Sequence, residues 1–343
     1  MQPVSAKNLR KLLLKFILRD GDIALNCFVE WEKQIIYDDL DFRSFKLLPA
    51  VYQKLFKTNI NGRLLLRIKG AYRRTWAENQ LLLNYLDKLF SLLKTTGIKF
   101  FIADENIRLT EIYHDPGIFS LQNFSIVVPF SDKNETCCKL SQNLWEICSE
   151  ELGKTEFKKD KSLHIQFLWI SDEDFSCQLK NVEEVLVKDK FQPVICPEEQ
   201  VLNLCANEFQ VFDAEESRWQ FIVSALFQAQ KINTIKLIEL ARKRNLAHQL
   251  TAMLQKLSDD FEVNIPANLM DSLRKIPKSG KLFLIRQKIH GFIESYQLFS
   301  KYEHRSGSKF GFLEFLAKRW KSDSSKVLFE QAIRSGIRLL QTK

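Results

Sequence analysis

Apolar side chains recur every three or four positions over most of this chain, which is the spacing of a buried helix face. In residues 6–56 the spacing is interrupted and predicts two or three short helices. Over residues 63–95 it predicts one long helix, weakened only at Gly70 and ending at Gly97, since glycine favours helix C-termini. The same spacing returns after Cys196, over residues 217–230, 232–246, 247–258, 281–300 and 310–340.

Three short runs in the middle of the chain carry the consecutive apolar, aromatic and β-branched residues that are typical of buried strands. They are residues 99–103, 124–128 and 163–170. Helices are expected between them, over residues 104–114 and 132–152. The pattern as a whole predicts an α+β protein that is mostly helical.

The change between helical and strand patterning predicts three parts. An N-terminal helical region covers residues 1–95, an α/β core covers residues 96–196, and a C-terminal helical region with a basic end covers residues 197–343.

Asp115-Pro116-Gly117 predicts a sharp turn before the second strand. Pro116 fixes its own φ angle and moves Asp115 out of the helical region. Gly117 can then take a positive φ at little cost. A strand after such a turn is where many enzymes hold metal-binding carboxylates, but here the strand begins with Asn123 and Ser125, which carry no charge.

The composition is that of a globular protein, with 45% hydrophobic and 27% charged residues in a chain of 343. The seven cysteines include no Cys-x-x-Cys pair, so we expect reduced thiols in a cytoplasmic protein. No run of 18 apolar residues occurs, so no transmembrane segment is expected. The five histidines show no metal-ligand spacing, and nothing in the sequence sets an oligomeric state.

The formal net charge of +9 is concentrated at the C-terminal end. Residues 274–343 hold sixteen Lys and Arg against five Asp and Glu. Anion binding by Lys318, Arg319 and Lys321 is one interpretation, which would give a steeply salt-dependent binder of nucleic acid or of another anionic surface. The plainer alternative is a solvated helix face. The same two interpretations apply to basic residues of the long helix, namely Arg63, Arg67, Lys69, Arg73 and Arg74.

Several short motifs occur in a characteristic order between residues 10 and 265. Together they resemble the uncharacterised bacterial nucleotidyltransferase-like family, a branch of the DNA polymerase β-like nucleotidyltransferase superfamily. The motifs are Leu47-Leu48-Pro49, Ala71-Tyr72, Asn79-Gln80-Leu81-Leu82, Gly97-Ile98, Tyr113-His114-Asp115-Pro116-Gly117, Val127-Val128-Pro129, Trp169, Pro197-Glu198-Glu199, Leu204-Cys205 and Leu240-Ala241-Arg242.

The resemblance implies that residues 96–196 form a small mixed-sheet nucleotidyltransferase-like core. In the superfamily, two carboxylates at the start of the second strand and a third on the next strand hold two divalent ions, which activate the attacking hydroxyl and neutralise the triphosphate. The motifs place these three positions on Asn123, Ser125 and Gln166, all neutral here. Phe119 stands where an arginine would be expected.

The resemblance therefore implies a catalytically degenerate protein, a pseudo-enzyme that binds a nucleotide or a protein partner and needs no cofactor. The alternative is an active metal-dependent nucleotidyltransferase that moves NMP from NTP to a small molecule or protein, with Mg²⁺ as cofactor. Relocated carboxylates would then be required, for which the candidates are Asp104, Glu105 and Asp115. The plainer interpretation of these three residues is helix capping and turn formation.

Overall fold

The computed structural model describes residues 6–121, 124–151, 153–160, 163–206 and 217–277 of the 343-residue chain. By their contacts, residues 1–276 belong to one compact unit. The basic helices expected over residues 281–300 and 310–340 lie outside the described residues, as do Lys318, Arg319 and Lys321.

The N-terminal region contains short helices, as predicted. Their facing sides share a core in which Phe16, Phe28 and Trp31 are fully buried, and the rings of Phe16 and Phe28 lie 4.9 Å apart. The carboxylate of Asp41 caps one helix by accepting hydrogen bonds from the next backbone N–H groups. The helices are α1 (Ala6–Leu18), α2 (Gly21–Gln34), α3 (Phe42–Phe45) and α4 (Leu48–Thr58).

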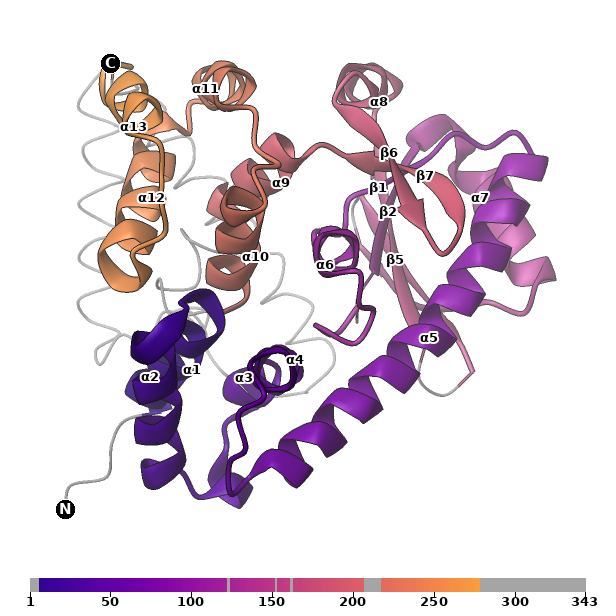
Figure 1. Cartoon of the computed structure of the whole chain (residues 1–343). Helices are drawn as coiled ribbons and strands as arrows, with labels where there is room; N and C mark the ends of the chain where they lie inside the picture. Colours follow the sequence, from indigo (N-terminus) through magenta and orange to yellow (C-terminus); the bar gives the residue numbers. More distant parts are fainter. Residues whose placement is uncertain (1–5, 122–123, 152, 161–162, 207–216, 278–343) are drawn as a thin grey trace, which may run out of the picture. The chain divides into compact units, whose positions relative to one another are not determined.

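The long helix α5 spans Leu65–Thr95 and confirms the prediction over residues 63–95. Gly97 follows it with a φ of +74°, which a side chain would oppose. The first half of α5 packs on α4, and its second half packs under the sheet (Figure 1). One rigid helix thus joins the N-terminal helices to the sheet.

Seven strands form one mixed sheet in the order β3-β4-β5-β2-β1-β7-β6. β2 runs parallel to β5 and β1 runs parallel to β7, while the other neighbours are antiparallel. This sheet, flanked by helices, confirms the α+β class. The strands are β1 (Phe101–Ile102), β2 (Phe124–Pro129), β3 (Glu146–Glu151), β4 (Lys154–Lys159), β5 (Leu163–Ile170), β6 (Val182–Val187) and β7 (Lys190–Ile195).

Two hairpins, β3–β4 and β6–β7, were not predicted from the apolar pattern. The helix expected over residues 132–152 is wrong in its second half, because α7 (Lys133–Gln142) ends before Leu144, which takes a left-handed φ of 63°. β3 then forms one edge of the sheet with mostly exposed side chains. An edge strand that buries few side chains leaves no apolar alternation to detect.

The two faces of the sheet differ in what covers them. On one face α5 and α7 bury a large apolar cluster, in which Phe90 of α5 stacks on Phe100 at 5.4 Å. On the opposite face a small cluster of Phe101, Val127, Phe175 and Ile195 packs beneath α8 (Asp172–Leu179). Beyond that cluster, β2, β5 and β4 carry polar side chains on this second face.

The last described part of the chain is helical, as predicted from the spacing after Cys196. Its apolar side chains share one core with the N-terminal helices, and α1 contacts α10 and α12. The helices are α9 (Pro197–Leu204), α10 (Ser217–Gln228), α11 (Thr234–Lys243), α12 (Ala247–Phe261) and α13 (Ala267–Arg274).

Among the described residues, no helix combines the length and the apolar character needed to cross a bilayer. The strands that the described residues form lie between residues 101 and 195. The division of the chain at residues 95 and 196 stays a prediction.

Candidate functional site

Ser125 and Gln166 are register partners on the neighbouring parallel strands β2 and β5. In both strands the residues on either side are buried in the core under α5, so these two polar side chains project to the opposite face. Because paired residues on adjacent strands lie about 5 Å apart, one ligand can contact both. Asn123 lies outside the described residues.

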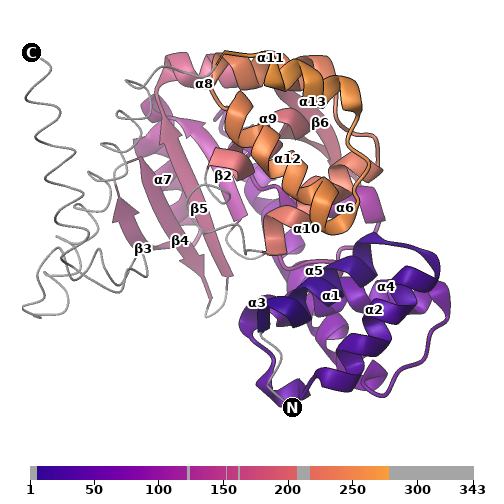
Figure 2. The same ribbon diagram turned by 90° about the vertical axis from the view of Figure 1, so that its left-hand side faces the viewer.

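The polar row continues across the sheet onto β4 and β3. Gln166 pairs with Glu156, and Glu156 pairs with Ser149. We call the four half-buried residues Ser125, Gln166, Glu156 and Ser149, together with the adjacent His164, the polar face. Figure 2 shows the four strands that carry it side by side.

Glu156 is the one carboxylate of this row, and protein partners occupy it. Its Oε1 lies 3.0 Å from Nδ1 of His164, and its Oε2 accepts a hydrogen bond of 3.2 Å from the hydroxyl of Ser149. Sequence reasoning missed Glu156 because β4 was not predicted. The alternation of Thr155 and Phe157 with charged residues was the signal that could have found this strand.

The polar face does not fit the pair of divalent ions that the family resemblance implies. A hydroxyl from Ser125 and an amide from Gln166 supply oxygen atoms without negative charge. Hard dications such as Mg²⁺ are held in proteins mainly by carboxylates. No group of three or more His, Cys, Asp or Glu side chains could hold a metal ion in the part of the chain that the structure describes.

Asp104 lies in the loop after β1 and is buried, with 3% of its surface exposed. Its Oδ1 accepts a hydrogen bond of 2.8 Å from the backbone N–H of Asn106, at the start of α6 (Asn106–Tyr113). Burial raises the pKa of this carboxyl to about 7, against the nearby positive charge of Arg218. Asp104 is therefore enclosed by protein at a helix start.

Glu105, at the start of α6, forms an ion pair with one of the C-terminal helices. Its Oε2 lies 2.8 Å from a guanidinium nitrogen of Arg218 in α10. The pair is largely buried, with 15% of the Glu105 side chain exposed. This contact ties the start of α6 to α10.

Asp115 is occupied by hydrogen bonds that fix the turn. Its carboxylate accepts bonds from the hydroxyl of Tyr72 at 3.1 and 3.2 Å, from the amide of Gln53 at 3.2 Å, and from the backbone N–H of Gly117 at 2.7 Å. Burial, followed by the charge of Asp115, raises the pKa of Tyr72 to about 12. The turn is thus held by α4 and α5.

Position 117 requires glycine because the ring of Tyr72 lies close to its backbone, and not because its φ angle is positive. Its φ is not among the positive values of the described residues, so that expectation is wrong. A Cβ atom at Gly117 would lie 2.6 Å from Cε2 of Tyr72. Only a residue without a side chain lets Tyr72 lie over the turn and reach Asp115.

Asn79 of α5 holds the chain that leads from the turn to β2. Its amide nitrogen donates to the carbonyl oxygens of Pro116 and Phe119 at 2.5 and 2.7 Å, and its Oδ1 accepts from the N–H of Leu121 at 3.1 Å. Phe119, the position where the resemblance implies an arginine, is buried and stacks on Phe221 at 5.7 Å. Phe119 is therefore part of the apolar core, and Asn79 holds the segment before β2.

Three arginines of the cluster expected on the long helix have protein partners. Arg63 donates to the carbonyl of Glu32, and Arg74 pairs with Glu78 at 2.8 Å. The guanidinium of Arg67 lies 5.1 Å from the ring centre of Tyr37.

No protein-family model matches the sequence, and no curated protein is significantly similar to it. Among solved structures, the fold is similar to an antigenic nucleotidyltransferase-like protein from Paracoccidioides brasiliensis. The match has 12% sequence identity and a TM-score of 0.38, and it covers 58% of this chain and 94% of that one. A superposition at this level transfers no residue roles.

Proposed function

We propose that this chain is a nucleotidyltransferase-like protein that has lost nucleotidyl transfer and uses its polar face to bind a nucleotide without divalent metal. The observation that carries the proposal is the register of Ser125 with Gln166. These neutral residues stand on one face of adjacent strands, at positions where the sequence resemblance implies metal-binding carboxylates. The face therefore has hydrogen-bonding groups without an anionic metal site.

The number of carboxylates that the polar face lacks supports the loss of catalysis. Metal ions in such sites supply several kcal/mol of transition-state stabilisation, and they depend on carboxylates that compete with water. Ser125 and Gln166 remove two of these charges, and the resemblance places the third on neutral Asn123. Asp104, Glu105 and Asp115 are each engaged by protein partners.

The polar face can still recognise a ligand by hydrogen bonds. The amide of Gln166 offers donors and an acceptor. His164 and Lys158 are register partners in the adjacent row, where the ammonium of Lys158 pairs with Glu146 at 3.0 Å. Such a face suits the polar base or sugar of a nucleotide without a metal bridge.

Calorimetric titration of the full chain with a non-hydrolysable NTP tests the proposal. We expect saturable binding with the same affinity in 5 mM Mg²⁺ and in EDTA, and at least a tenfold loss of affinity in Gln166→Ala. The ligand concentrations should cover Kd values from about 1 μM to about 1 mM, which correspond to binding free energies of about −8.2 to −4.1 kcal/mol. Metal-dependent binding together with Mg²⁺-dependent pyrophosphate release would overturn it.

A control variant separates loss of the ligand contact from loss of fold. Leu186→Ala changes a side chain that is 54% exposed on β6, at the far edge of the sheet. We expect this variant to bind the nucleotide as the parent chain does. Equal losses in Gln166→Ala and Leu186→Ala would place binding elsewhere.

A further inference from the structure

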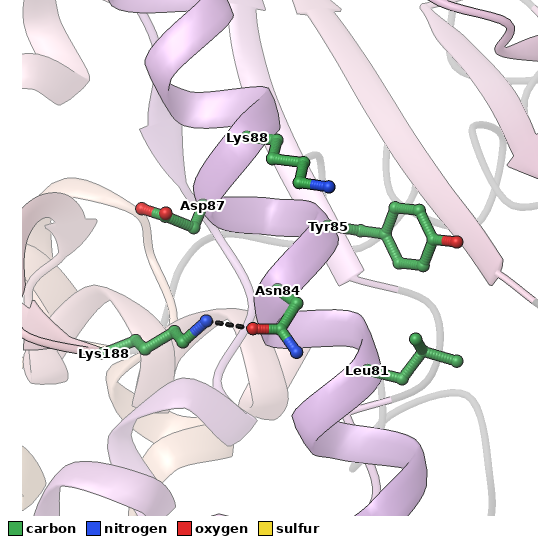
Figure 3. A pocket seen from close by; sticks show the side chains of 6 residues that line it. All are labelled: Leu81, Asn84, Tyr85, Asp87, Lys88 and Lys188. Atoms are coloured by element: carbon green, nitrogen blue, oxygen red, sulfur yellow. Dashed lines mark hydrogen bonds between the residues drawn. The ribbon is translucent and has the colours of Figure 1, made fainter.

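A second site lies on the outer side of α5. A cavity of about 410 Å³ lies between this helix and the turn of the β6–β7 hairpin, lined by Leu81, Asn84, Tyr85, Asp87, Lys88 and Lys188 (Figure 3). We propose that it binds a small organic phosphate, independently of the polar face. Its volume falls within the range of about 300–1,000 Å³ that is usual for small-molecule sites.

The helix side of the cavity is built from one stripe of α5. Leu81 lies three and four positions before Asn84 and Tyr85, and Lys88 lies four and three positions after them, so their side chains line one surface. Leu81 is 50% exposed and supplies apolar area. The hydroxyl of Tyr85 donates to Asp160 at 2.5 Å, which fixes the ring at the edge of the cavity.

The hairpin side is supplied by Lys188 in a two-residue turn. Lys188 and Asp189 both have left-handed φ angles, of 48° and 65°. Such turns favour Asn-Gly, and a residue with a Cβ atom in this region costs about 1 kcal/mol or more. From this strained position the ammonium group of Lys188 donates a hydrogen bond to the side-chain amide oxygen of Asn84 on α5.

The residues that line the cavity carry a net positive charge. Asp87 is matched by Lys190, whose ammonium lies 2.6 Å from its carboxylate. Lys188 contacts a neutral amide, and Lys88 has no carboxylate within ion-pair distance among the residues that the structure describes. Lys88 and Lys188, from two different elements, thus line one cavity (Figure 3), while the acidic groups beside it are engaged, Asp87 by Lys190 and Asp160 by the hydroxyl of Tyr85.

A phosphate group fits this arrangement because ammonium groups form charge-assisted hydrogen bonds with phosphate oxygens. The exposed side chain of Leu81 and the ring of Tyr85 would contact the organic part. An organic phosphate should therefore bind more tightly than inorganic phosphate, and added salt should weaken both.

The test uses the full chain and phenyl phosphate, followed by ³¹P NMR titration at low salt, with inorganic phosphate as the second probe. We expect saturable binding of phenyl phosphate that exceeds binding of inorganic phosphate, and more than a tenfold loss in Lys88→Ala with Lys188→Ala. The control pair Lys69→Ala with Arg73→Ala removes two charges from α5 outside the cavity and should leave binding unchanged. Gln166→Ala should also leave it unchanged, so failure of the polar face is separable from failure here.

The variant Lys188→Asn separates the contribution of Lys188 to ligand binding from its effect on the stability of the turn. Asparagine tolerates a left-handed φ, so the melting temperature should be equal to or higher than that of the parent, while affinity for phenyl phosphate falls. Retained affinity in this variant, equal loss in the Lys69 and Arg73 control, or no saturable binding of either probe by the parent chain would overturn the proposal.

Discussion

The hydroxyl of Tyr72 on α5 lies 3.1 and 3.2 Å from the two carboxylate oxygens of Asp115, in the turn before β2. This contact joins the long helix to the loop that leads into the polar face. The same carboxylate accepts a hydrogen bond from the backbone N–H of Gly117 and so fixes the turn that precedes β2.

Replacing Tyr72 with Phe should lower the free energy of unfolding at pH 7 by about 2 kcal/mol, since hydrogen bonds to charged groups contribute about 1.5–3 kcal/mol. Urea denaturation followed by circular dichroism measures this loss. A loss below about 0.5 kcal/mol would show that the contact does not hold the turn.

The same contact predicts a pH dependence at the alkaline end. The folded pKa of Tyr72 is raised to about 12 from an ordinary value of 10.0. The unfolded chain therefore loses this proton first, so the contribution of Tyr72 is complete below pH 10 and disappears as the pH rises towards 12. The difference in unfolding free energy between the parent and Tyr72→Phe should shrink over this interval; a constant difference would contradict the assignment.

Gly117→Ala and Gly70→Ala form a matched pair. A Cβ atom at position 117 would lie 2.6 Å from the Tyr72 ring, so Gly117→Ala should destabilise the fold by about 1–3 kcal/mol, as overpacking does. Gly70 lies inside α5 with no atom within 4 Å of its added Cβ, so Gly70→Ala should stabilise by about 0.5–1 kcal/mol. Thermal unfolding compares them, and shifts of the same sign would refute the close approach at the turn.

Asp104→Asn should raise stability at pH 8 and flatten its dependence on pH. Burial raises the pKa of Asp104 from 3.8 to about 7, so its cost to the folded state is absent below pH 3.8 and grows as the pH rises towards 7. Asparagine keeps an oxygen that can accept the bond from Asn106 and cannot ionise. Urea midpoints between pH 5 and 8 measure the effect; a midpoint lowered at pH 8 would mean that ionised Asp104 is stabilising.

The parts of the fold that bury apolar side chains could be predicted from the sequence. The long helix, the two central strands and the helices α10, α11 and α12 follow from spacing alone. The short helix α13 was not predicted. The β3–β4 and β6–β7 hairpins could not, because their exposed positions carry polar residues and their burial depends on neighbours far away in the chain.

Ser125 and Gln166, two of the positions that the motifs implied, are register partners in the structure, and their role in a site stays a prediction. The bond from Asn106 to Asp104 is local and agrees with the capping interpretation. The long-range partners of Glu105 and Asp115 come from α10, α4 and α5, and no local pattern connects these segments. Gly117 shows the same limit, since only the packing of Tyr72 explains it.

The central claim, that the polar face has too little negative charge for a pair of divalent ions, is tested most directly by Mn²⁺ binding followed by electron paramagnetic resonance. The parent chain and the triple variant Asn123→Asp, Ser125→Asp, Gln166→Asp are compared. The control carries Leu186→Asp and Phe191→Asp, at two exposed register partners near the far edge of the sheet. We predict no saturable binding by the parent or the control and saturable binding by the triple variant. Saturable Mn²⁺ binding by the parent chain that Gln166→Ala abolishes would contradict the account.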